Sequence, residues 1–310
     1  GQDALIRART LILPAASGLP EGAVMGKGLY PAFSWNVAPY IKASLFDPQN
    51  PLRADFGLRL SGKYDIAPGL VLSGAVTKKL VGNLNKSERV SNSILPHVRS
   101  DSNKYDASGD PAIENLTLAW YAKPAPNLYS RVTLGLLEPM FGGISGELLW
   151  KRVDRPYALG VELDYVKQRD FDQLFGFKDY SVMTGHVSGY YDFGNGFQAQ
   201  LDVGRYLAGD YGATLALDRE FANGWRIGAF ATLTDVSFND FGEGSFDKGI
   251  RIRIPFAWAI GQPTQKNAGM VVRPILRDGG ARLNVDGRLY DFVRDYHSDR
   301  LDDQWGRFWR

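Results

Sequence analysis

Alternation of apolar and polar residues between positions 197 and 258 constrains this chain more than any other feature. In the first run, every second residue is apolar and the intervening residues are polar or small: Phe197, Ala199, Leu201 and Val203 against Gln198, Gln200, Asp202 and Gly204. The pattern returns at residues 215–217, 225–233 and 250–258. Because successive side chains of a strand point to opposite faces, each run has one apolar and one polar face. The sequence therefore predicts four consecutive antiparallel strands.

Two architectures use strands of this kind, a soluble β-sandwich and a transmembrane β-barrel. In a sandwich the apolar face is about five residues long per strand. Here the runs reach about ten residues and end in aromatic residues, which is typical of a barrel with lipid outside and water inside. The pattern favours the transmembrane barrel over a secreted carbohydrate-binding sandwich.

Further strands are expected upstream, at residues 30–45, 53–64, 70–81, 113–122, 128–137, 144–153, 158–167 and 182–193. Tight connections alternate with longer ones, as periplasmic turns alternate with extracellular loops in outer-membrane barrels; the tight ones are 65–69, 123–127, 154–157, 194–196 and 222–224. The longest polar insertion, residues 83–112, contains one aromatic residue and is expected to be a large loop.

These segments together predict an all-β fold, a transmembrane antiparallel up-and-down β-barrel of about 12 strands over residues 29–290. Closure is required because strands in lipid must satisfy every backbone polar group. A final hairpin at residues 270–277 and 282–289 would raise the count to 14. Residues 1–28 are expected to be a lead-in or lumen segment, and residues 291–310 a charged C-terminal tail that could be helical.

Length and composition fit one barrel and limit the partners. The chain has 310 residues, which one closed barrel can use, and no apolar run of about eighteen residues that would form a membrane-spanning helix. A net charge of +2 argues against nucleic acid as a partner. Without cysteine there is no disulfide framework or thiolate metal site. The first residues do not resemble a signal peptide, which suggests a mature chain or a piece of a longer one.

Five segments carry a family resemblance: SGELLW at 145–150, YVKQRDFD at 165–172, FGFKDY at 175–180, GRYLAGD at 204–210 and GEGSFDKG at 242–249. They resemble the YjbH-like outer-membrane proteins of exopolysaccharide biosynthesis, a family also known through the group-4 capsule protein GfcD. The resemblance covers most of the chain from about residue 18 to residue 291. It implies a bacterial outer-membrane β-barrel that works with periplasmic or outer-membrane secretion partners on an extracellular polysaccharide.

The resemblance supplies no catalytic residues. Members of the family are usually considerably longer, so the chain resembles their C-terminal part. Two arrangements stay open: the chain closes a barrel alone, or it completes a wall together with an N-terminal portion.

Hydrolase chemistry is the alternative from another functional class. Some outer-membrane barrels are lipases, which use serine and histidine, but this sequence has three histidines and no Gly-x-Ser-x-Gly elbow. Of the three (His97, His186 and His297), His186 lies within an alternating run, where a lumen or interface role is commoner. No catalytic residue and no cofactor is therefore expected.

Two acidic motifs are better explained by a polar loop and by ion pairs than by metal binding or catalysis. Asp101, Asn103 and Tyr105 have the spacing that begins a calcium loop, but the glycine and closing glutamate that such a loop needs are missing. Asp170 and Asp172 could serve as acid and base in glycoside cleavage. Their neighbours Arg169 and Lys178 favour ion pairs instead. No metal site is expected.

Charged residues on the polar faces of the strands are the better functional candidates. Eleven are expected to face the lumen: Arg59, Lys63, Lys78, Glu147, Lys151, Glu162, Asp164, Asp202, Asp218, Arg251 and Arg253. They either pair across strands and fill the barrel, or form a hydrogen-bonding conduit or docking surface for a sugar chain. The predicted function is non-catalytic participation in polysaccharide export or assembly; the alternatives are a general porin-like channel and an outer-membrane hydrolase.

The opposite face should meet lipid. Leu201, Leu215 and Ile252 are expected to contact acyl chains near mid-membrane. Aromatic side chains should mark the two membrane interfaces, where amphipathic rings settle; the candidates are Trp120, Trp150, Trp225, Trp258, Tyr165 and Tyr191.

Overall fold

The computed structural model describes residues 30–45, 50, 52–87, 90–221, 223–238, 240–241, 246–255, 267–273 and 278–294. The expected lead-in at 1–28, most of the expected tail and Trp258 lie outside these ranges. The described residues form one antiparallel sheet in which every strand pairs with its neighbours in sequence, over 13 strands. The strands are β1 (Ala32–Leu45), β2 (Leu52–Ala67), β3 (Leu70–Gly82), β4 (Ala112–Ala125), β5 (Leu128–Leu136), β6 (Phe141–Lys151), β7 (Tyr157–Arg169), β8 (Phe177–Asp192), β9 (Phe197–Arg205), β10 (Tyr211–Glu220), β11 (Arg226–Thr234), β12 (Asp247–Pro255) and β13 (Asn267–Val272).

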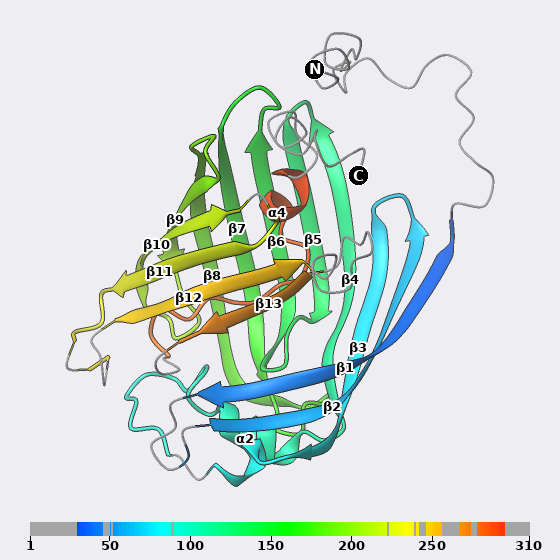
Figure 1. Cartoon of the computed structure of the whole chain (residues 1–310), viewed down its shortest axis with the longest axis vertical. Helices are drawn as coiled ribbons and strands as arrows, with labels where there is room; N and C mark the ends of the chain where they lie inside the picture. Colours follow the sequence, from blue (N-terminus) through cyan, green and yellow to red (C-terminus); the bar gives the residue numbers. More distant parts are fainter. Residues whose placement is uncertain are drawn as a thin grey trace.

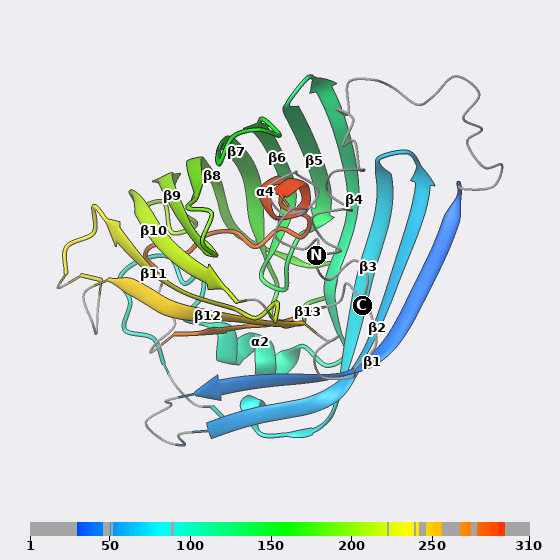
Figure 2. The same ribbon diagram turned by 45° about the horizontal axis from the view of Figure 1, so that its top comes forward.

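The sheet curls around an interior, so that β1 and β2 come to the same side of the molecule as β12 and β13 (Figures 1 and 2). Strands β1 and β13 are the two ends of the strand order, and each pairs with one neighbour among the described residues. The prediction of an all-β, antiparallel, up-and-down sheet is confirmed. The described part of the chain contains no helix long and apolar enough to cross a membrane.

Among the described residues, the strand count of 13 differs from the predicted 12 or 14. Strand β13 forms at the first half of the expected final hairpin, but residues 282–289 do not pair as a strand. They belong to a segment, residues 278–294, that enters the interior and ends in the helix α4 (Leu289–Arg294). We call residues 278–294 the interior segment. Its backbone N–H groups of Asn284 and Leu289 donate to the carboxylates of Glu138 and Glu147, not to a neighbouring strand.

The sheet buries its polar face and exposes its apolar face. Strand β7 shows this most clearly, because its residues alternate between exposed and buried along nearly the whole strand. Leu163 is 60% exposed, whereas Glu162 and Asp164 on either side are 3% and 2% exposed. Burial of carboxylates beside exposed leucine is the reverse of what water favours. The inner face is therefore polar and the outer face apolar.

The same outer face continues around the sheet. Large exposed apolar residues stand on successive strands, among them Leu60, Val76, Leu116, Leu134, Leu148, Leu163, Val187, Leu201, Leu215, Leu233 and Ile250. Of the predicted lipid-contact residues, Leu201 and Leu215 are exposed and Ile252 is partly exposed. Of the predicted interfacial aromatics, Trp120, Tyr165 and Tyr191 are exposed, whereas Trp150 and Trp225 are partly buried. Contact with lipid stays a prediction.

Residues 83–112 are not simply a solvated loop. They contain a short 3-10 helix, η2 (Leu84–Lys86), and the helix α2 (Ser102–Ser108), which lies at the lower end of the sheet in Figure 1. Tyr105 of α2 is 1% exposed, and its hydroxyl donates to the carbonyl oxygen of Arg169 at 2.6 Å. Its ring belongs to an apolar cluster with Phe141, Leu207, Leu283 and other interior residues. We call this end of the sheet the loop end.

A second apolar cluster lies nearer the opposite end, where the short β4–β5 and β6–β7 connections turn (Figure 1). We call this the turn end. Here α4 packs against the wall through Leu289, Tyr290 and Val293, and the Tyr290 ring stacks on Tyr190 with centroids 3.8 Å apart. The interior segment thus runs from the loop end to the turn end. Its apolar side chains pack in both clusters. Its polar groups face the wall of the sheet between the two clusters.

Candidate functional site

The inner face of the sheet is the candidate site, because it gathers nearly all of the predicted charged residues. All of them except Lys78 lie on this face: Arg59, Lys63, Glu147, Lys151, Glu162, Asp164, Asp202, Asp218, Arg251 and Arg253. Most are buried or half-buried, and Lys63 is the most exposed of the set, paired with Asp65 at 2.9 Å.

The prediction that Lys78 faces the interior is wrong. Lys78 is paired in register with Leu58 and alternates with exposed Val76 and Leu80, so it lies on the outer face. The next residue, Lys79, takes the inward position. The β2–β3 register shift lies beyond Lys78, between the pairs Gly57–Lys79 and Phe56–Val81, so unbroken alternation with Val76 and Leu80 already places Lys78 outside. Its charge suggested the inward position, but its ammonium group pairs with Asp110 at 3.0 Å.

Glu162 of β7 is the centre of an ionic cluster that holds the interior segment. Its Oε2 atom accepts hydrogen bonds from Arg282 Nη2 at 2.6 Å and from Arg288 Nη1. Arg282 also reaches the Asp202 carboxylate of β9 at 2.8 Å. Burial by itself lowers the pKa of the Arg282 guanidinium, but the carboxylates of Glu162 and Asp202 raise it overall. The guanidinium of Arg282 therefore stays charged inside the sheet, between two carboxylates.

Two more wall carboxylates bind the backbone of the interior segment. Glu138 accepts a hydrogen bond from the Asn284 N–H at 3.0 Å, and Glu147 accepts one from the Leu289 N–H at 3.2 Å. Each carboxylate is also paired with an arginine. Arg99 contacts Glu138 at 2.6 Å, and the fully buried Arg131 contacts Glu147 at 3.0 Å.

At the turn end the contacts involve α4. Arg294 pairs with Glu220 at 3.0 Å and donates to Gln198, while Asp291 lies 3.7 Å from Arg253. The predicted candidate Arg253 thus touches the interior segment. Its neighbour on the same face, Arg251, pairs instead with the wall residue Asp218 at 2.6 Å. Ionic contacts therefore anchor the interior segment along its whole length.

Several residues of this network are missing from the predicted set, namely Arg99, Arg131, Glu138, Glu220, Arg282, Arg288 and Arg294. Arg131 had a usable signal, because it and Thr133 alternate with Val132 and Leu134 as an inward pair would. The arginines of the interior segment have no such signal, because the alternation of residues 282–289 fits a final strand equally well.

The side chains of the possible calcium loop and the Arg169 side chain beside the carboxylate pair make hydrogen bonds and ion pairs within the protein. Asp101 precedes the first residue of α2 and pairs with His97 and Lys104, at 3.1 and 3.0 Å. Arg169 donates to the carbonyl oxygens of Glu138, Gln173 and Leu174, so its expected ion pair with Asp170 or Asp172 does not form. Among the residues that the structure describes, no group of three or more His, Cys, Asp or Glu side chains could hold a metal ion.

His186 occupies an unusual position on the inner face. It is 3% exposed, its ring meets the Tyr206 ring edge-to-face with centroids 4.7 Å apart, and neither ring nitrogen has a hydrogen-bond partner in the described ranges. Nearby, Asp164 accepts a hydrogen bond from the Thr184 hydroxyl at 3.0 Å. His186 is therefore packed as part of the wall, and its ring makes no hydrogen bond to a serine hydroxyl within the described ranges.

Comparison with known proteins identifies the family. The family model YjbH, described as exopolysaccharide biosynthesis protein YbjH, matches residues 13–295. The chain belongs to this family. Within the YjbH family, the uncharacterized lipoprotein YjbH of Escherichia coli (strain K12) is 32% identical over 271 residues. That match covers 85% of this chain and 39% of the relative, so the chain spans about two fifths of the relative's length. The resemblance noted in the sequence is confirmed.

A solved structure of OmpF from Salmonella typhi, in complex with daunomycin, also matches. The match has a TM-score of 0.38 and 11% sequence identity, and it covers 79% of this chain and 90% of that one. At this level the likeness adds nothing to what the strand order already establishes.

Proposed function

We propose that this YjbH-family chain forms the wall of a bacterial outer-membrane β-barrel that takes part in export or assembly of an extracellular polysaccharide, as a conduit or docking partner. One observation carries the proposal: the sheet exposes a continuous apolar outer face and buries charged side chains inside. Exposed apolar surface on this scale marks contact with lipid or protein. Apolar residues outside and polar residues inside, alternating along long antiparallel strands, are the arrangement of transmembrane barrels.

The interior chemistry supports a sugar polymer as the partner. Carboxylates and guanidinium groups alternate and pair along the inner face, so neither sign dominates. Such a surface offers many hydrogen-bond donors and acceptors without a strong field of one sign, and therefore suits a hydroxyl-rich chain better than a simple ion. The family's role in exopolysaccharide biosynthesis supports the same partner. Secretion proteins of the periplasm or outer membrane would complete the pathway.

The interior segment favours this function over a general porin. A porin needs a water-filled channel, whereas the interior segment crosses the curled sheet and is bonded to β6, β7 and β9. A conduit would have to displace this segment, and a docking partner would use it as it stands. A hydrolase has less support. No serine hydroxyl is bonded to a histidine ring among the residues described, and the proposed role is non-catalytic.

Extraction behaviour tests the membrane part of the proposal. We expect the full-length protein to sediment with outer membranes and to require detergent for monodisperse purification, because its outer face is apolar on successive strands. A monodisperse, detergent-free preparation would contradict membrane insertion and favour a secreted carbohydrate-binding protein.

Genetic complementation tests the role in export. Deleting the gene should reduce surface polysaccharide, and wild-type protein should restore it. A variant with Arg251→Ala and Arg253→Ala should restore it only in part, because Arg253 contacts Asp291 of the interior segment. Lys167→Ala, on the outer face of β7, is the matched control and should restore export fully.

Conductance of the purified protein in planar bilayers distinguishes a general porin from a protein of polysaccharide export. Unchanged polysaccharide after gene deletion, together with steady ion conductance, would favour the porin and overturn the export role. Normal export by the double arginine variant would leave the export role standing and assign these two arginines to structural pairing.

A further inference from the structure

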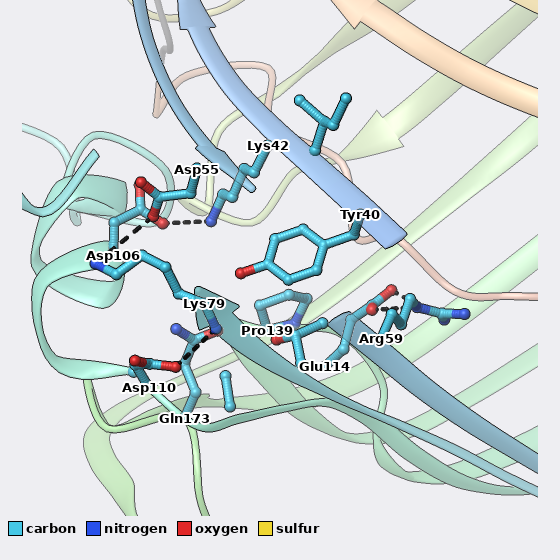
Figure 3. Close-up of a pocket in the computed structure, with 14 residues that line it drawn as sticks. Tyr40, Lys42, Asp55, Arg59, Lys79, Asp106, Asp110, Glu114, Pro139 and Gln173 are labelled. Atoms are coloured by element: carbon cyan, nitrogen blue, oxygen red, sulfur yellow. Dashed lines mark hydrogen bonds and ion pairs between the residues drawn. The ribbon is translucent and has the colours of Figure 1, made fainter. Parts of the chain in front are cut away.

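A cavity of about 320 Å³ lies at the loop end, between the inner face of β1–β3 and the segments around α2. It is separate from the ionic cluster around Glu162. Figure 3 shows the Tyr40 side chain reaching across it, with Lys42, Asp55 and Asp106 on one side and Arg59 with Glu114 on another. We call this space the Tyr40 cavity. Its volume lies at the lower end of the range for small-molecule sites, which suits about one or two sugar rings.

A glycine on the next strand makes room for the Tyr40 ring. Tyr40 and Gly57 are cross-strand partners, and a Cβ atom on Gly57 would lie 2.5 Å from Tyr40 Cε1. A larger residue at position 57 would meet both the Tyr40 ring and the carbonyl oxygen of Lys78, 2.3 Å from that Cβ. The hydroxyls of Tyr40 and of Thr77, which also lines the cavity, make no hydrogen bond to any residue that the structure describes. The cavity thus contains an aromatic ring and two hydroxyls available to a ligand.

The charged groups of the cavity are all paired, Asp110 with Lys78 of the outer face at 3.0 Å and the others with one another. Arg59 binds Glu114 through two hydrogen bonds of 2.6 and 3.2 Å, and Lys42 pairs with Asp106. Lys79 Nζ lies 3.8 Å from Asp55 Oδ2. Pairing leaves little net charge to attract a phosphate or another anion, but each carboxylate keeps lone pairs that can accept a hydrogen bond from a hydroxyl.

We propose that the Tyr40 cavity is a binding subsite for a sugar unit of the polysaccharide. The Tyr40 ring would pack against the C–H face of the sugar, while the Tyr40 and Thr77 hydroxyls and the paired carboxylates would bond its hydroxyl groups. Aromatic side chains with a polar tip suit ligands that are apolar on one surface and polar at their edge. This inference rests on the proposed function, because it assigns a place on the wall where the exported polymer is held.

Binding measurements with oligosaccharides test the subsite. The probe is a partial acid hydrolysate of the exopolysaccharide secreted by the organism that encodes the protein, titrated into full-length protein in detergent by calorimetry. Tyr40→Ala should weaken binding about tenfold, because it removes the ring contact. Tyr40→Phe and Thr77→Val each remove only a hydroxyl and should weaken it about threefold. Tyr64→Ala is the matched control, since Tyr64 is a β2 tyrosine on the outer face that packs against Phe33.

The two hydroxyl variants keep the test valid if Tyr40→Ala does not fold. Equal affinity for wild type, Tyr40→Phe and Thr77→Val would overturn the subsite, and so would the absence of any binding. A response to inorganic phosphate as strong as that to the hydrolysate would overturn the choice of a sugar. Loss of export on gene deletion combined with unaltered binding by the cavity variants would reject the subsite while leaving the proposed function in place.

Discussion

Replacing Glu162 with alanine is expected to destabilise the protein by about 3–5 kcal/mol, the usual cost of removing one partner from a buried ion pair. Glu162 is 3% exposed, and its Oε2 atom accepts hydrogen bonds from both Arg282 and Arg288. Without it, Arg288 loses its carboxylate partner and Arg282 keeps only Asp202. The measurement is the free energy of unfolding in urea for protein folded into lipid vesicles.

Glu114→Ala is the matched control for this prediction. Glu114 also pairs with an arginine, Arg59, but both side chains are about a third exposed, and such pairs contribute about 1 kcal/mol or less. Trypsin provides a second readout, because release of the interior segment would make Arg282 and Arg288 accessible to cleavage. Equal stabilities for the Glu162→Ala and Glu114→Ala proteins, with no new tryptic cleavage, would show that the ionic cluster does not anchor the segment.

Leu215→Arg should cost about 2–4 kcal/mol if Leu215 lies at the membrane midplane, because a cation on the lipid face loses its hydration. Leu215 is 59% exposed on β10, and its cross-strand partners are Leu201 and Ala231. An aligned row of apolar residues on three strands is what a lipid-facing band requires. Folding yield and urea stability in phosphatidylcholine vesicles measure the effect.

Gln200→Arg provides the comparison on the other face of the sheet. Gln200 points inward and donates to the Asp202 carboxylate, so an arginine there would meet an acceptor of opposite charge. The protein should tolerate Gln200→Arg far better than Leu215→Arg. Similar losses at both positions, or no loss at either, would contradict the assignment of the outer face to lipid.

Alternation in the sequence was sufficient to predict the strands and their facing. In β7, leucine and valine at 159, 161 and 163 alternate with Gly160, Glu162 and Asp164, and the structure exposes the first set and buries the second. This signal is reliable because the two faces of the sheet meet different surroundings over the whole strand. Family membership was likewise readable from local segments.

At position 78 the residue type and the alternation disagree. Alternation from Val76 to Leu80 places Lys78 outside, and the register shift of the β2–β3 pair lies beyond it. A charged residue is expected inside, but Lys78 stands near the strand end, where its ammonium group pairs with Asp110 at 3.0 Å. The Tyr40 cavity could not be predicted from alternation either, because its lining residues come from strands and loops far apart in the chain.

The sequence by itself determined an antiparallel sheet with a polar and an apolar face, because that property belongs to each strand alone. Only the tertiary structure decided that residues 282–289 would fill the interior and not extend the sheet. Their polar and apolar residues alternate as a strand's would, but alternation records which side of a segment is polar and not what its backbone bonds to. The carboxylate that holds Arg282 is 120 residues away at Glu162. Once β7 and β9 have brought Glu162 and Asp202 together on one wall, pairing with buried carboxylates competes with pairing to β13 for this segment.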